Sequence, residues 1–144
     1  MDVSYRKSDR LDMHPTRPTV LLRHTLPDGS FHFDWMLARD GVGPLLTFRL
    51  EQDISEGSDG FTGKHLPDHR RVYLEYEGPI SGDRGRVDRV AHGTCVIMAE
   101  SQDELRIRLD LGRCRGIVGG IRRTTDEFLF GFLPKCDRNN TIFE

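Results

Sequence analysis

The chain has few cysteines, no long apolar run and almost no excess charge of either sign. Its three cysteines, Cys95, Cys114 and Cys136, are far apart and include no Cys-x-x-Cys pair. This spacing provides neither a disulfide framework nor the paired ligands of a structural zinc site. We therefore expect reduced thiols in a cytoplasmic protein.

The sequence also lacks the features of secreted, membrane-spanning and DNA-coating proteins. Its first residues are charged without an apolar core, and no other stretch is apolar over the length of a bilayer crossing. We expect no secretion signal and no membrane partner. The net charge of −2, from 21 basic and 23 acidic side chains, argues against a broad cationic surface that coats duplex nucleic acid, although a local basic pocket remains compatible with it.

Short apolar runs separated by glycine and aspartate fill the middle of the 144-residue chain, a pattern typical of strands joined by turns. We predict one mainly β domain at 19–134, a small antiparallel β-barrel with long loops and little helix, between flexible tails at 1–18 and 135–144. The predicted strands cover 20–26, 30–37, 45–50, 71–77, 85–91, 94–98, 104–111, 113–121 and 127–133. The stretch 51–68, with three glycines and five acidic residues, is predicted to be a long irregular loop.

A predicted hairpin brings together three candidate metal ligands. The segment 30–37 alternates, with His32 and Asp34 on one face and aromatic residues on the other. A three-residue bulged loop at 27–29 would place His24 opposite His32. Two imidazoles and a carboxylate on one patch suit Mn, Fe or Zn. A two-residue loop would instead set His24 opposite Phe33 and send it to the other face. The same residues are also compatible with a polar outer face whose histidines contact only solvent.

A second group of candidate residues lies at 69–77. If this segment is a strand, His69, Arg71 and Tyr73 share one face. A His, an Arg and a Tyr on one face could stabilise and protonate a phosphoryl group. An ordinary solvated strand surface accounts for the same pattern.

Together these two segments resemble the 3′-phosphoesterase domain of bacterial DNA ligase D and its free-standing relatives. That family's signature is a His, a short spacer and His-aromatic-Asp-aromatic-Arg-Leu, followed later by Asp-His-x-x-x-Tyr-x-x-aromatic-Glu-Gly-x-Ile. Here His24 precedes His-Phe-Asp-Trp-Met-Leu at 32–37, and 68–80 matches the second part at every fixed position. The resemblance covers about 19–134. Met36 stands where the family has an Arg that grips phosphate, and the spacer between the two histidines is longer here.

The resemblance implies a divalent metal, typically Mn²⁺, held by His24, His32 and Asp34. It also implies that His69 and Tyr73 are catalytic residues. A methionine cannot donate a hydrogen bond, so the phosphate-binding Arg of the family has no equivalent at position 36. We predict that Arg71, from the second motif, contacts the substrate phosphate instead.

The implied activity is removal of 3′-phosphates or 3′-ribonucleotides from nucleic-acid ends during DNA repair. The corresponding partners are the 3′ ends of DNA or of a primer–template, with a repair ligase or polymerase as a protein partner. The alternative is a non-catalytic family member that binds strand ends or a repair protein. Met36 favours this alternative because it removes a phosphate contact.

Overall fold

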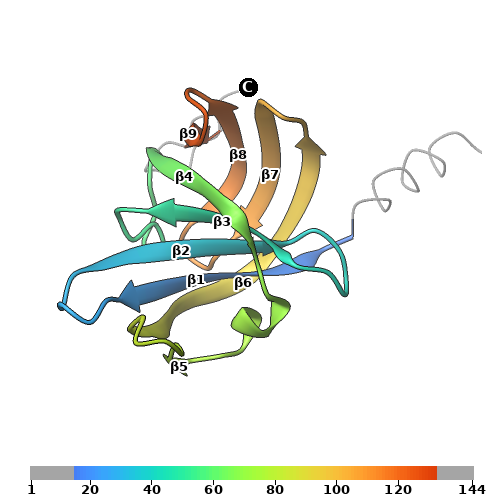
Figure 1. Ribbon diagram of the computed structural model, residues 1–144. Helices are drawn as coiled ribbons and strands as arrows, with labels where there is room; N and C mark the ends of the chain where they lie inside the picture. The colour runs from blue at the N-terminus through green and yellow to red at the C-terminus, as the bar shows by residue number, and fades with distance from the viewer. Residues whose placement is uncertain (1–14, 133–144) are drawn as a thin grey trace, which may run out of the picture.

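In the computed structural model, which describes residues 15–132, nine strands form one sheet. The strand order is β1-β2-β3-β4-β9-β8-β7-β6-β5, and β1 also pairs with β6. Eight antiparallel strands therefore close a barrel, with β5 as an extra strand (Figure 1). The predicted β-barrel is confirmed. No helix within the described residues has the length and apolar character needed to cross a bilayer.

The strands and the one short helix have the following bounds. The elements are β1 (Arg17–Thr25), β2 (Phe31–Ala38), β3 (Leu45–Leu50), β4 (Gly60–His69), the 3-10 helix η1 (Arg71–Leu74), β5 (Gly78–Pro79), β6 (Arg86–Glu100), β7 (Glu104–Asp110), β8 (Arg115–Arg122) and β9 (Glu127–Phe132). Strand β1 begins inside the predicted N-terminal tail. The rest of that tail, at 1–14, the predicted C-terminal tail and Cys136 lie outside the described residues.

The barrel interior is packed with aromatic and aliphatic side chains. Because strand side chains alternate between faces, Phe33, Trp35 and Leu37 of β2 all point into it. The Trp35 ring lies edge-on to Phe61 and Phe130, with centroid separations of 5.6 and 5.4 Å. The inner face of the β1–β2 hairpin therefore packs against this core.

A second apolar cluster lies on the outer side of the same wall. Val20, Leu22 and Met36 project outward from β1 and β2 and pack with Val87 of β6. The connection at 73–80 covers them, and in Figure 1 this connection, with η1 and β5, runs outside the barrel next to β1 and β6. One outer face of the barrel is thereby partly enclosed.

The prediction of an irregular loop over 51–68 is wrong for its second half, which is β4. Inward positions of β4 are Phe61 and Gly63, and a Cβ built on Gly63 would come within 3.0 to 3.3 Å of Leu50, Phe130 and Phe48 side chains. The interior therefore requires a glycine where strand patterns usually show an apolar residue. Because this inward position is a glycine and the outward positions are polar, the sequence here lacks the alternation of apolar and polar residues that identifies a strand.

The two strands predicted at 85–91 and 94–98 are one continuous strand, β6. The residues between them include Gly93, which pairs with Thr19 of β1. A Cβ at Gly93 would lie 1.8 Å from the carbonyl oxygen of Asp110. This glycine thus allows the close approach of the neighbouring chain within the sheet and does not mark a turn.

The strand predicted at 71–77 is also wrong. The backbone N–H of Tyr73 donates to the carbonyl of Arg70 at 3.1 Å, and that of Glu75 donates to Val72 at 3.0 Å. These local bonds form the single turn η1. In a strand, Val72 would lie on the face opposite His69, Arg71 and Tyr73 and would point to the core, but here it is half exposed.

Candidate metal centre

The hairpin of β1 and β2 has the register that brings the candidate ligands together. The N–H of Leu26 donates to the carbonyl of Ser30 at 2.8 Å, and Gly29 takes a φ of +91°. His24 consequently lies opposite His32. The predicted three-residue loop is confirmed, and the two-residue alternative is excluded.

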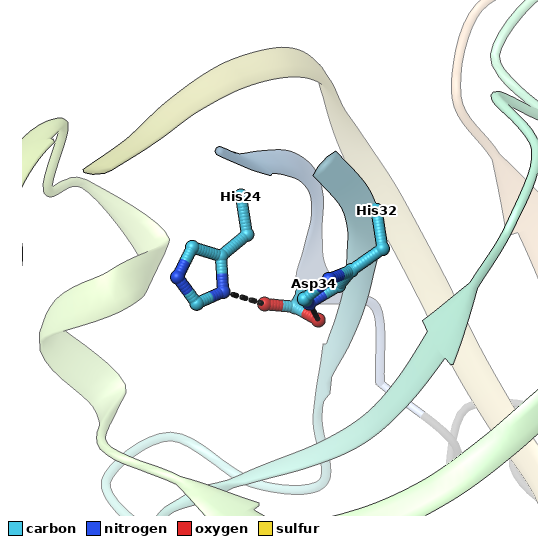
Figure 2. Close-up of side chains that lie close together, drawn as sticks. All are labelled: His24, His32 and Asp34. Carbon is cyan, nitrogen blue, oxygen red and sulfur yellow. Dashed lines mark ion pairs between the residues drawn. The ribbon is translucent and has the colours of Figure 1, made fainter. Parts of the chain in front are cut away.

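His24, His32 and Asp34 converge on the outer side of the barrel wall (Figure 2). Each offers one ligand atom, and these atoms lie within 4.8 Å of one another. His32 Nε2 is 3.2 Å from Asp34 Oδ1, and His24 Nδ1 is 3.6 Å from Asp34 Oδ2. The carboxylate therefore sits between the two imidazoles, as Figure 2 shows.

A backbone carbonyl fixes the orientation of His24. Its Nε2 lies 2.8 Å from the carbonyl oxygen of Arg84, in the connection between β5 and β6. A carbonyl oxygen can only accept, so Nε2 carries the hydrogen. In the neutral ring, Nδ1 then presents a lone pair to the Asp34 carboxylate. Two electron-rich atoms facing each other are favourable only with a cation or a second proton between them.

The cluster also contains buried polar atoms without hydrogen-bond partners. In residues 15–132, three buried side-chain N or O atoms lack a partner, and two of them are His32 Nδ1 and Asp34 Oδ1. Asp34 is only 3% exposed and His32 only 6%. Unpartnered buried polar atoms are uncommon and costly. A cation bound between the three side chains would satisfy Asp34 Oδ1, and two imidazoles with a carboxylate are a donor set that fits a divalent metal ion.

A pocket of about 400 Å³ adjoins the cluster. His24 and Asp34 lie on one side of it, and the apolar part of its lining includes Met36, Ile80 and Val87. Met36 is 1% exposed and belongs to the outer apolar cluster. The position at which the family has an Arg is therefore part of an apolar lining.

The structure brings the two predicted catalytic residues to this pocket. His69 and Tyr73 both line it, with their ring centroids 6.1 Å apart. His69 Nδ1 lies 2.9 Å from the carbonyl oxygen of Pro67 and must donate to it, because a carbonyl cannot. This leaves Nε2 of His69 available for proton transfer.

Arg71 does not join His69 and Tyr73, and it is not among the residues that line the pocket. Its Nη1 donates to the carbonyl oxygens of Asp40 and Gly43, at 3.0 and 3.2 Å. Hydrogen bonds from the N–H groups of Gly43 and Val42 lower the pKa of Asp40, so its carboxylate stays negative near Arg71. The face shared by the three residues depended on a strand, and η1 directs Arg71 to the loop between β2 and β3.

Two arginines that the sequence reasoning missed line the pocket instead. Arg70 precedes η1, with its guanidinium carbon 5.8 Å from the Tyr73 ring centroid, and Arg84 lies in the turn before β6. Arg70 falls within the second motif, so that motif was a usable signal. The contact of His24 with Arg84 joins residues 60 positions apart, and no local pattern announces it.

A scan against protein-family models finds no match to this chain, and a search of curated proteins finds none either. The residues and geometry of the site are therefore the basis for assigning a function.

Proposed function

We propose that the chain is a divalent-metal-dependent phosphoesterase that removes 3′-phosphates or 3′-ribonucleotides from nucleic-acid ends in DNA repair, with Mn²⁺ as its metal. The proposal joins the resemblance to the ligase D phosphoesterase domain with the arrangement of the pocket. Its substrates are the 3′ ends of DNA or of a primer–template.

The observation that carries the proposal is the electronic mismatch at Asp34. When the His24 ring is neutral, the buried carboxylate meets its lone pair, and Asp34 Oδ1 has no hydrogen-bond partner within the described residues. A cation resolves both conditions. His24, His32 and Asp34 would hold it at the edge of the pocket.

When bound, the metal would neutralise phosphate oxygens and lower the pKa of a bound water. The protein positions this centre from two directions. The hairpin register fixes the three ligands on one face of the wall, and the Arg84 carbonyl fixes the His24 ring. Such preorganisation reduces the reorganisation needed when charge develops on the phosphate.

His69 is the candidate general acid or base. Its Nδ1 is engaged by the Pro67 carbonyl, so Nε2 can take up or release a proton at the reacting group. Tyr73 packs beside it and offers a hydroxyl that can donate a hydrogen bond. Proton transfer by a positioned side chain typically contributes about 10²- to 10⁴-fold to the rate.

The deciding experiment uses a labelled primer that ends in a 3′-phosphate or in one ribonucleotide. We expect conversion to a 3′-hydroxyl end with Mn²⁺, and none after chelation. His32→Ala should abolish conversion, because it removes a candidate ligand from the hairpin. Closed circular DNA should stay intact, because a net charge of −2 gives little attraction for long duplex tracts. Wild-type protein that binds Mn²⁺ but leaves both primers unchanged would contradict the proposed activity.

Met36 supports a second candidate function, a non-catalytic protein that binds strand ends or a repair protein. Its side chain is buried in the apolar cluster and provides no phosphate contact. Fluorescence anisotropy separates the two candidates. A catalytically inert member would bind a 3′-phosphorylated end more tightly than a 3′-hydroxyl end and release it unchanged.

A further inference from the structure

We propose that Arg84, assisted by Arg70, forms a phosphate-binding subsite next to the candidate metal centre. The inference rests on the proposed function and deepens it by assigning the group that recognises the substrate phosphate. It places this guanidinium on the turn between β5 and β6, whereas the family signature has an Arg on β2 and our sequence prediction used Arg71.

Arg84 is joined to the candidate metal centre through its own backbone. Its carbonyl oxygen accepts the hydrogen bond from His24 at 2.8 Å, and Arg84 is one of the residues that line the pocket with His24 and Asp34. An anion held by a metal in this pocket would therefore lie close to Arg84.

The Arg84 side chain is held in one orientation and still has free hydrogen-bond donors. Nε donates to the carbonyl oxygen of Ser81 at 2.7 Å, and Nη2 donates to the Ser81 hydroxyl at 3.3 Å. A guanidinium carries five N–H donors in a planar fork. Two bonds to one residue hold the group in place and leave Nη1 free within the part of the chain that the structure describes.

The balance of charge in the pocket also favours a bound anion. Within residues 15–132, neither Arg84 nor Arg70 forms an ion pair, whereas Arg39 pairs with Glu100 and with Asp68 at the pocket rim. The Asp68 charge is thus already balanced. Of the acidic residues that line the pocket, only Asp34 lacks an arginine partner, and it belongs to the metal cluster. With a divalent cation in place, the pocket has an excess of positive charge that a phosphate dianion would compensate.

The local backbone gives the turn a defined shape. Gly85 has a φ of +91°, and a Cβ there would lie 1.9 Å from the carbonyl oxygen of Thr25. Asp83 also takes a positive φ, of 55°. A non-glycine residue at positive φ is uncommon, and aspartate is one of the residues that tolerate it in turns. The turn is therefore seated directly against the end of β1.

The test measures inorganic phosphate binding to the Mn²⁺-loaded protein by calorimetry, in the parent and in Arg84→Ala, Arg84→Lys and Arg108→Ala. Arg108 lies on the exposed face of β7, so its variant removes the same charge away from the pocket. We expect Arg84→Ala to weaken phosphate binding about 10- to 150-fold, Arg84→Lys to recover part of the loss, and Arg108→Ala to change it less than about twofold. Mn²⁺ affinity, measured separately, should stay within about twofold in all variants.

Three results would overturn the subsite. These are no phosphate binding by the parent, equal losses in Arg84→Ala and Arg108→Ala, or a parallel loss of Mn²⁺ affinity in Arg84→Ala. The last would mean that the substitution acts through the carbonyl on His24. If the subsite is correct and the proposed function is wrong, phosphate binding will still depend on Arg84, but the 3′-phosphorylated primer will stay intact.

Discussion

Asp34→Asn should remove the stabilisation of the fold by Mn²⁺ without unfolding the protein. The substitution keeps the size of the side chain and removes the charge that lies between the two imidazoles. Asp34 is 3% exposed, and its Oδ1 lacks a hydrogen-bond partner within the described residues. Neutralising a buried charge that is poorly compensated removes a desolvation cost, which offsets the lost contacts. We therefore expect the metal-free variant to unfold within about 4 °C of the parent, or about 1 kcal/mol.

The magnitude with metal follows from mass action. At a free Mn²⁺ concentration 100 times the dissociation constant, binding adds about 2.7 kcal/mol to the free energy of unfolding. Roughly 120 ordered residues unfold with an entropy of about 0.25 kcal/mol per kelvin, so Tm should rise by about 10 °C. Losing one charged ligand should weaken Mn²⁺ binding about 100-fold or more, since even outer partners contribute about 10- to 100-fold. At the same Mn²⁺ concentration the variant should then gain less than about 2 °C.

The assay is thermal unfolding over a Mn²⁺ titration of the parent, Asp34→Asn and Asp126→Asn. Asp126 is a half-exposed carboxylate 3.9 Å from Lys64, and its substitution corrects for weak binding of metal to surface acids. It should keep the parental rise in Tm. An equal rise in the Asp34→Asn variant would refute the assignment of the site, as would a parent whose Tm does not respond to Mn²⁺.

Three further predictions concern the acid–base residue, the buried thiols and the turn beside the site. His69→Ala should lower turnover of a 3′-phosphorylated primer by about 10²-fold or more with unchanged Mn²⁺ affinity; a parallel loss of affinity would assign His69 to the metal centre. Burial raises the pKa of Cys95 to about 12 and that of Cys114 to about 11 from an ordinary 9.0. Between about pH 9 and 11 the unfolded chain thus releases protons that the folded chain keeps, and urea unfolding should show the free energy of unfolding falling by up to about 1.4 kcal/mol per pH unit for each thiol; a flat profile would contradict this. Gly85→Ala and Gly29→Ala share a native φ of +91°, but only Gly85 faces a backbone atom within 4 Å of the added Cβ. The strained φ should lower the free energy of unfolding of both variants by about 1 to 2 kcal/mol. Gly85→Ala should lower it further and also weaken Mn²⁺ binding; equal losses in the two variants would show that the turn is free to move.

The cluster of His24, His32 and Asp34 could be predicted because it depends on short-range rules. A loop of three residues fixes the pairing of the two strands, and alternation then decides which side chains share a face. Both rules operate within the sequence from His24 to Asp34. The structure has this register, so the hairpin needed no information from the rest of the chain.

The strand β4 could not be predicted, because its pattern is set by distant packing. Gly63 is required by side chains of β3 and β9 that lie close to it in the barrel. Glycine and acidic residues nearby are statistical signs of a loop. At position 63 the absence of a side chain makes room for the Phe130 ring. This packing requirement is apparent only when the pairing of the strands is known.

The prediction of which arginine lies at the pocket was wrong for a related reason. Alternation was applied to 71–77, although the backbone there bonds to itself in η1. Tyr73 still reaches the pocket, while Arg71 turns to the loop at Asp40 and Gly43. A helical turn changes the direction of successive side chains by a different angle from a strand, so the alternation of a strand assigned Arg71 to the wrong face.

The two faces of the β1–β2 hairpin connect the stability of the barrel to the geometry of the candidate site. On the inner face, Trp35 Nε1 donates to the Thr19 hydroxyl at 3.1 Å, and this hydroxyl donates to the Met36 carbonyl at 2.7 Å. On the outer face, the same strand β2 carries His32 and Asp34 of the cluster. A slip of one residue would exchange the two faces, burying a charged carboxylate in the aromatic core and exposing Trp35. The free energy that holds Trp35 inside the barrel therefore also holds Asp34 between the histidines, so substitutions that loosen the core at Trp35 should weaken metal binding even though they touch no ligand.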